Sequence, residues 1–186
     1  MDDNTIIDLF WSRSETAIAE TNKKYGAYCM TIAMNILQNR EDSNECLNDT
    51  YHMTWSAIPP QRPVIFPAFL GRIARNVSLN KYKARHTKKR GGQEMDVLLS
   101  ELEHCLPAPN NVEAEYETGQ VAKTISNFLY AMNTHDRIIF VRRYWYADSI
   151  AALAQRYQMG ESKVKSLLFR TRNKLRVYLE REEVNL

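Results

Sequence analysis

The sequence contains no apolar run long enough to cross a bilayer. It also contains few cysteines, which can cross-link a chain, and few glycines and prolines, which favour turns. Its 186 residues include three cysteines, six glycines and six prolines. Because a membrane-spanning helix needs about 20 consecutive apolar residues, we expect no membrane insertion. The acidic start MDDNTIIDLF has no basic segment followed by an apolar core, so we also expect no secretory signal. Three widely spaced cysteines suit reduced thiols, and a cytoplasmic location is the simplest interpretation.

Signatures of metal and nucleotide chemistry are also missing. Cys29, Cys46 and Cys105 form no CxxC pair, and the four histidines show no HxxxH spacing. Since zinc sites usually need four ligands, we expect no metal site. The segment KKRGGQ lacks the GxxxxGK[ST] spacing of a phosphate-binding loop. His52 has no evident serine or cysteine nucleophile near it. We therefore expect no cofactor and no catalysis, so the chain is not predicted to be an enzyme.

Charge is distributed unevenly along the chain, although the net charge is only +3. The ten residues 81–90, KYKARHTKKR, include six lysines or arginines. The next stretch, residues 91–120, contains seven acids and no lysine or arginine. From Arg137 to Arg181 the chain is strongly basic again. Such alternation indicates two basic modules separated by an acidic connector.

The apolar residues recur with a helical period of 3.6, and few segments favour strands. The pattern predicts an all-α protein made of two small helical domains joined by an acidic flexible linker. The expected domains are residues 1–90 and 119–186, with residues 91–118 as the linker. Asp42 or Ser43 is the expected N-cap of the second helix. Helices are expected at about 15–37, 43–57, 66–83, 120–132, 134–144, 149–157 and 162–182, with a short helix in 96–106 of the linker.

Residues 149–176 have the pattern of a helix-turn-helix. In MGESKVKSLLFRTRNKLR the apolar positions Val164, Leu167, Leu168, Thr171 and Leu175 form one helical stripe. A short helix with Ile150, Leu153 and Ala154 inside precedes it across a tight turn. Gln158 stands where such turns often have glycine, so we expect Gly160 to supply the flexibility and Ser162 to cap the second helix.

The polar residues of the second helix are donors that can reach bases and phosphates in a major groove about 12 Å wide. A basic helix face is most often merely solvated, but the preceding helix and turn favour a DNA-binding surface. The role of Phe169 stays open between contact with a thymine methyl and contact with an inhibitor. The candidate DNA-binding residues here are Ser162, Lys163, Lys165, Ser166, Arg170 and Arg172.

The first half of the chain contains an acidic segment that ends in aromatic-x-x-x-Trp, NREDSNECLNDTYHMTW (39–55), followed by FPAFLGRIARNVSLNKYKAR (66–85). These two segments resemble region two of bacterial sigma factors, in which an acidic helix has the same ending. FPAFLGRIARNVSLNKYKAR (66–85) matches the pattern Phe-x-x-Trp-Leu-x-x-Ile-Ala-Arg-Asn, with Phe69 in place of the frequent tryptophan. The second module is similar to region four of the same family. Because only these two regions and a short connector are present, the chain resembles the extracytoplasmic-function group of sigma factors.

This resemblance implies that the chain binds core RNA polymerase and promoter DNA. An acidic helix face would dock on the clamp helices of the largest polymerase subunit, and region four would contact the flap of the second-largest subunit. Region four would recognise the minus-thirty-five element. An anti-sigma factor is a possible further partner, and the acidic connector would follow the RNA-exit path. The implied polymerase-binding residues, which helix 43–57 is expected to display outward, are Asp42, Glu45, Asn48 and Asp49.

Region two would recognise and melt the minus-ten element. The loop 59–67 would hold a flipped base, with Ile58, Ile65 and Phe66 as an apolar wall and Gln61 and Arg62 as polar edges. A structural ion pair is an equally good interpretation of Arg75, and a solvated surface is the alternative for the acidic helix face. The implied DNA-binding residues are Arg62, Arg72, Arg75, Asn76, Asn80, Lys83 and Arg85.

Two other classes of function are alternatives to the sigma factor. A stand-alone helix-turn-helix regulator would bind duplex DNA without polymerase, but it leaves the acidic helix face and residues 66–85 unexplained. A nucleic-acid enzyme would need a carboxylate or metal cluster, and none is evident in the sequence.

Overall fold

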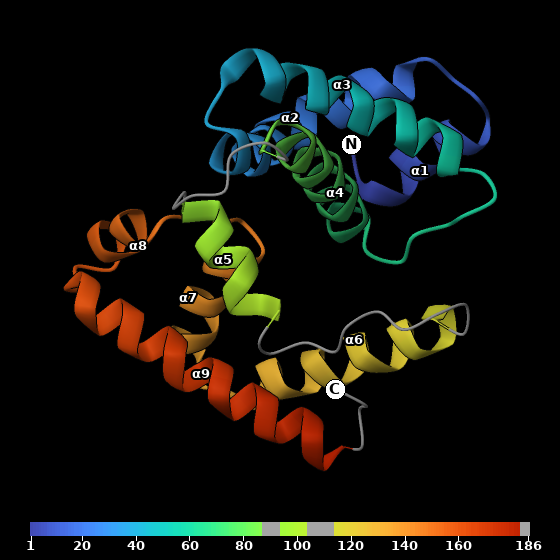
Figure 1. Cartoon of the computed structure of the whole chain (residues 1–186). Helices are drawn as coiled ribbons and strands as arrows, with labels where there is room; N and C mark the ends of the chain where they lie inside the picture. Colours follow the sequence, from blue (N-terminus) through green and yellow to red (C-terminus); the bar gives the residue numbers. More distant parts are fainter. Residues whose placement is uncertain (87–93, 104–113, 183–186) are drawn as a thin grey trace. The chain divides into compact units, whose positions relative to one another are not determined.

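The computed structural model describes residues 1–86, 94–103 and 114–182, and all regular secondary structure in these ranges is helical (Figure 1). The expected all-α class is confirmed. The chain divides into two compact units, Met1–Arg90 and Gly91–Leu186. Within the described ranges, no helix combines the length and apolar content needed to cross a bilayer.

In the first unit, residues 1–86 form four helices: α1 (Asp3–Trp11), α2 (Thr16–Leu37), α3 (Arg40–Ala57) and α4 (Phe66–His86). Helix α1 is not among the helices expected from the sequence. The other three agree with the expected helices except at the start of α3. There the side chain of Asn39 accepts a hydrogen bond from the Asp42 amide at 3.0 Å, so Asn39 is the N-cap and the expected cap at Asp42 or Ser43 is wrong. This cap extends the helix toward its N-terminus.

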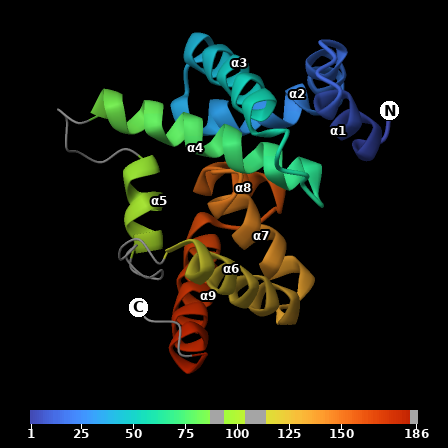
Figure 2. The same cartoon turned by 90° about the vertical axis from the view of Figure 1, so that its right-hand side faces the viewer.

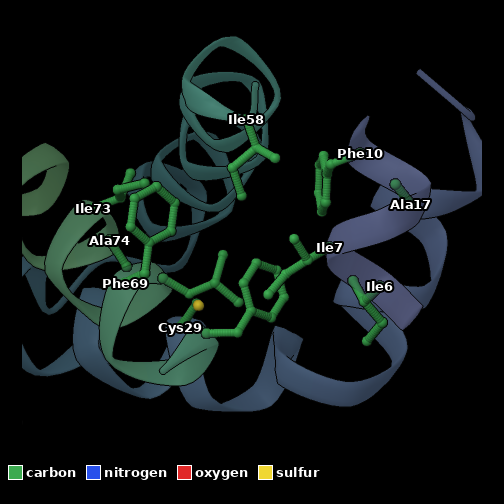
Figure 3. Packing of buried hydrophobic residues seen from close by; sticks show 11 residues of the cluster. Ile6, Ile7, Phe10, Ala17, Cys29, Ile58, Phe69, Ile73 and Ala74 are labelled. Atoms are coloured by element: carbon green, nitrogen blue, oxygen red, sulfur yellow. The ribbon is translucent and has the colours of Figure 1, made fainter. Parts of the chain in front are cut away.

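The core of the first unit is built around aromatic rings. Phe66, at the start of α4, lies 6.1 Å from Phe10 and 5.9 Å from Tyr25 between ring centroids. Trp55 of α3 meets Phe10 edge-on at 6.0 Å. Figure 3 shows Ile7 and Phe10 pointing from α1 into the same interior as Ile58 and the side chains of α4. The nine-residue α1 therefore closes one side of the core.

A glycine allows α2 and α3 to pack closely. Gly26 is buried, and the Tyr51 hydroxyl donates a hydrogen bond to Asn22 Oδ1 at 2.7 Å beside it. A Cβ added at Gly26 would collide with the Asn22 side chain and lie 3.3 Å from the Tyr51 oxygen. The hydrogen bond between the two helices thus needs a residue without a side chain at this point.

The second unit contains α5 (Glu94–Glu103), α6 (Ala114–Ala131), α7 (Thr134–Tyr144), α8 (Ile150–Arg156) and α9 (Glu161–Arg181). The short helix expected in the connector is present as α5, with somewhat earlier bounds, and α7 has the expected bounds. Asn133 and Ser149 cap α7 and α8 through their side-chain oxygens. Helices α6 and α9 lie side by side in both views (Figures 1 and 2). The apolar stripe predicted for α9 is entirely buried: Val164, Leu167, Leu168, Thr171 and Leu175.

The turn between α8 and α9 differs from the expectation. Gln158 itself takes the left-handed conformation (φ 51°), whereas Gly160 has an ordinary extended backbone (φ −70°, ψ 144°). The amide of Met159 donates to the Ala154 carbonyl at 2.9 Å and that of Gln158 to the Gln155 carbonyl at 3.3 Å. These two bonds close the end of α8 as a Schellman motif. The N-cap of α9 is Gly160, so the expected capping role of Ser162 is wrong.

Candidate nucleic-acid interface

Helix α9 exposes a row of donors opposite its buried stripe. The exposed side chains include Ser162, Lys163, Lys165, Ser166 and Arg170, which are five of the six candidate residues in this unit. Phe169 lies among them with 57% of its surface exposed. The Lys165 ammonium is 3.7 Å from Glu161 one turn earlier, an exposed pair of little strength. Hydroxyl, ammonium and guanidinium groups are therefore presented on one side of a helix held by its apolar stripe.

The sixth candidate, Arg172, does not lie with these donors. Its side chain is only 14% exposed, and Nη1 donates to the Tyr144 hydroxyl at 2.5 Å. The same nitrogen is 3.2 Å from Glu101 Oε1 of α5. The role of Arg172 as a DNA contact stays a prediction, but in this structure its guanidinium faces into the second unit.

Arg172 belongs to a polar cluster that the sequence analysis missed. The Tyr144 hydroxyl donates to Glu101 Oε2 at 3.0 Å, and Arg143 Nε lies 3.8 Å from the same oxygen. Burial of the Tyr144 ring raises the pKa of its hydroxyl, and the Glu101 charge raises it further. Tyr144 is therefore a neutral donor throughout the physiological range.

The cluster continues into the loop after α7. Arg143 Nη1 donates to the Asp148 carbonyl at 2.9 Å, and Arg142 Nε donates to the Asp148 carboxylate at 2.5 Å. Both Arg143 (1% exposed) and Asp148 (5%) are buried. The sequence signal was the segment RRYWYAD, in which two arginines precede an aspartate by five or six residues.

In the first unit, α4 presents four of its candidate DNA-binding residues along one exposed face. Arg72, Asn76, Asn80 and Lys83 are all exposed, and they are spaced by three or four residues along the helix. The Arg72 guanidinium carbon lies 5.5 Å from the centroid of the Phe69 ring, within the range of a cation–π contact. Two amides, Asn76 and Asn80, therefore lie between two cations, Arg72 and Lys83, along this face.

The remaining candidates in the first unit, Arg62, Arg75 and Arg85, differ in exposure and in their partners. Arg62 forms an ion pair with Asp8 at 2.6 Å, and Arg85 pairs with Asp42. Arg75 is half-buried, and its Nη1 has no hydrogen-bond partner among the described residues. Burial lowers the pKa of the Arg75 guanidinium. The surroundings of Nη1 therefore favour neither of the two roles expected for Arg75, a structural ion pair and a DNA contact.

The expectation that Asp42 points outward is wrong. Asp42 is 6% exposed and accepts the ion pairs of two α4 residues, Arg85 and, at 3.4 Å, Lys81. Lys81 and Arg85 are four residues apart, so both side chains reach α3 from the same face of α4. Glu45 also pairs with Lys81 but is exposed, as are Asn48 and Asp49. The acidic surface of α3 therefore retains three of its four candidate residues.

Two of the three residues expected to form an apolar wall in the loop before α4 are not available for that role. Ile58 and Phe66 are fully buried in the core, so neither can face a base. Ile65 is 63% exposed, as expected, and the neighbouring Val64, which the sequence analysis did not single out, is 98% exposed. An exposed apolar pair thus stands beside Gln61 and Arg62, which are also exposed.

Among the described residues, no group of three or more histidine, cysteine, aspartate or glutamate side chains is arranged to hold a metal ion. Cys105 lies outside the described residues, whereas Cys29 and Cys46 are buried. Burial raises the pKa of the Cys29 thiol to about 12, so it is unreactive at neutral pH. No model of a known protein family matches the chain, and no curated protein sequence matches it either.

Proposed function

We propose that the chain is a sigma factor of the extracytoplasmic-function group, which binds core RNA polymerase and directs it to specific promoters. The second unit would recognise the minus-thirty-five element as duplex, and the first unit would recognise and melt the minus-ten element. The observation that supports this most strongly is the coexistence of two separate donor faces. One is on α9 of a helix-turn-helix, and the other is on α4 of a different unit, as the sequence motifs of regions four and two lead one to expect.

The α8–α9 geometry suits insertion into a major groove. In a helix-turn-helix the second helix lies in the groove, where its N-terminal residues contact base edges. Ser162, Lys163 and Ser166 occupy the first turns of α9 and are exposed, with Arg170 one turn further. Contacts to phosphate would position the helix, and a few contacts to bases would provide specificity.

The first unit suits contacts with a partly opened duplex. Arg72 and Lys83 would bind the backbone, while Asn76 and Asn80 can hydrogen-bond to base edges. An unstacked base needs an apolar surface to compensate for lost stacking, and Val64 with Ile65 provides one beside exposed polar groups. Glu45, Asn48 and Asp49 on α3 would meet the basic clamp helices of the largest subunit.

The other expected partners belong to the same proposal. The flap of the second-largest polymerase subunit would contact the second unit, and an anti-sigma factor would hold the free protein inactive. All of these interactions take place in the cytoplasm, and the chain performs no catalysis itself.

Run-off transcription with purified core polymerase tests the proposal. Genomic fragments should yield discrete transcripts only when the chain is added. Failure to initiate on any fragment, together with tight duplex binding by the chain alone, would instead favour the stand-alone regulator.

The variant Asp49→Arg sharpens this test. Reversing an exposed charge on α3 should abolish capture of core polymerase while helicity is unchanged, because the clamp surface is basic. Glu15→Arg is the matched control, since it makes the same charge change at an exposed residue before α2. Normal polymerase capture by Asp49→Arg would refute the assigned surface.

A further inference from the structure

Helix α5, from the acidic part of the chain, places a carboxylate against the helix-turn-helix unit. Met95 and Leu98 of α5 are buried, and the helix packs on α7. Glu101 follows Leu98 by one turn and points its two oxygens at side chains of α7 and α9. The acidic connector is therefore anchored to the second unit at one defined point.

The groups around Glu101 form a site suited to an oxyanion. The Tyr144 hydroxyl donates to Oε2 at 3.0 Å, and Arg143 Nε is 3.8 Å from that oxygen. Arg172 Nη1 is 3.2 Å from Oε1. Two guanidinium groups and a hydroxyl thus converge on one anion. Arginine forks bind the oxygens of a phosphate with the same geometry as those of a carboxylate.

The site borders the exposed donor face of α9. Arg172 follows Phe169 by three residues and Lys165 by seven, so the three side chains lie along one edge of the helix. The Arg172 guanidinium carbon is 5.9 Å from the centroid of the exposed Phe169 ring. Without Glu101, Arg172 would keep its hydrogen bond to the neutral Tyr144 hydroxyl but lose its charged acceptor, so a phosphate anion could draw the side chain toward this face.

We propose that Glu101 competes with a backbone phosphate of duplex DNA for Arg172. In the free chain, α5 occupies the anion site and removes one cation from the DNA-binding edge of α9. When duplex DNA binds, a phosphate takes Arg172 and α5 detaches from it. This inference rests on the proposed function only in that α9 is the DNA-binding helix; it does not depend on polymerase.

Substitution Glu101→Gln in the full chain tests the competition. The amide keeps the size of the side chain but removes its charge. Affinity for a short duplex of arbitrary sequence should rise about fivefold at low salt, as expected for one added ionic contact. The dependence of log K on log salt should steepen by about 0.9, the value for one phosphate.

Two comparisons separate the competition from a general charge effect. Asp96→Asn makes the same charge change on the same helix, five residues before Glu101 and therefore on another face, and should change the affinity much less. The gain from Glu101→Gln should vanish when it is combined with Arg172→Gln. An equal gain in Asp96→Asn, a gain that persists without Arg172, or no gain at all would overturn the inference.

Hydrogen exchange provides a readout that needs no variant. Amides of α5 should lose protection when the unmodified chain binds duplex DNA, because the phosphate displaces Glu101. Retained protection of α5 at saturating DNA would overturn the inference even if Glu101→Gln fails to fold. The same assays contain no polymerase, so their outcome is independent of run-off transcription. A gain in DNA affinity without promoter-dependent transcripts would leave the competition standing and reject the sigma factor.

Discussion

The interiors of the two units are stabilised by different kinds of contact. In the first, the central cluster is apolar and aromatic, and the ion pairs of α1, Lys24–Asp3 and Arg62–Asp8, lie at the surface. Asp42 of α3 is buried there as well, and Lys81 and Arg85 of α4 pair with it. In the second, Arg143 and Asp148 are buried within a cluster that also engages Glu101 and Arg172. Burial of charge is costly unless each group has partners, so Arg143 and Asp148 permit few alternative arrangements of α7 and the loop that follows it.

The difference has a consequence for function. The charged contacts of the second unit are directional: Arg142 and Arg143 hold the loop that leads to α8 through bonds of 2.5 and 2.9 Å to Asp148. In the proposed function this would fix α8 against the DNA-binding helix α9, and specific contacts with bases require positioning to within a fraction of an ångström.

Removing an aromatic ring should destabilise the first unit the most. Phe66→Ala deletes a fully buried side chain that contacts Phe10 and Tyr25, and we expect a loss of about 3–5 kcal/mol in the free energy of unfolding. Urea denaturation with hydrogen exchange resolved by segment measures it. The control Phe169→Ala removes the same ring from an exposed site and should cost less than about 0.5 kcal/mol. Equal destabilisation of both units would contradict the separation of their cores.

Removing a buried charge should destabilise the second unit in the same way. Arg143→Met keeps the length of the side chain but leaves Glu101 and the Asp148 carbonyl without this donor. We expect a loss of about 3 kcal/mol, confined to α5–α9 in hydrogen exchange. Arg156→Met, at an exposed position of α8, is the control. If the second unit of Arg143→Met has the same free energy of unfolding as that of the wild type, the cluster does not stabilise the unit.

The exposed arginines of the same unit should behave differently from the buried ones. Arg170→Ala should leave stability unchanged but reduce affinity for the upstream promoter element by about 1–3 kcal/mol, if the guanidinium contacts a base through two bonds. Titration of a labelled duplex measures this. Arg176→Ala, further along α9 and beside Glu180, is the matched control. Equal losses in the two variants would show a diffuse charge effect in place of recognition by a specific residue.

The surface ion pair between Asp3 and Lys24 should have a smaller effect on stability, and this effect should depend on pH. Burial alone would raise the pKa of Asp3, but hydrogen bonds from Lys24 and Tyr25 outweigh it, and the net pKa is below the usual 3.8. Because the folded pKa is the lower one, the stabilisation is present above about pH 3.8 and is lost as the pH falls through the folded pKa. The carboxylate is partly exposed, so the effect should be about 0.5 kcal/mol.

Comparison of the wild type with Asp3→Asn checks this pH dependence. The advantage of the wild type in urea denaturation should shrink as the pH falls from 5 toward 2, by about 0.5 kcal/mol in total. An advantage that grows on acidification would show that the sign is wrong. Glu15→Gln, at an exposed residue outside this pair, serves as the control.

Local periodicity was sufficient to predict most helices. The stripe of α9 and the bounds of α7 follow from apolar spacing, because a helix repeats every 3.6 residues whatever packs against it. Helix α1 was missed because its buried residues, Ile6, Ile7 and Phe10, fall within only nine residues. Such a short helix is stable only when it packs on the rest of the fold.

The candidate sites were harder to predict, since they depend on contacts between distant residues. The polarity of Asp42 favours an exposed position, but Lys81 and Arg85 of another helix reach it and compensate its burial. Likewise, the spacing of α9 leaves Arg172 at the edge of the apolar stripe, and the positions of Glu101 and Tyr144, on two other helices, decide which way its guanidinium points. Exposure of Ile65 and burial of Phe66 beside it also depend on where the loop joins the core.

The close packing of α2 and α3 at Gly26 restricts which substitutions the first unit can accept. Alanine there would push Asn22 away from Tyr51, and the pair of helices could adapt only by losing that hydrogen bond or moving apart. Substitutions at 22, 26 and 51 are therefore not independent, because a side chain at 26 would displace the Asn22 amide that accepts from the Tyr51 hydroxyl. The three positions should covary as a set, whereas exposed residues of α9 such as Ser166 and Arg170 can be replaced without disturbing this packing.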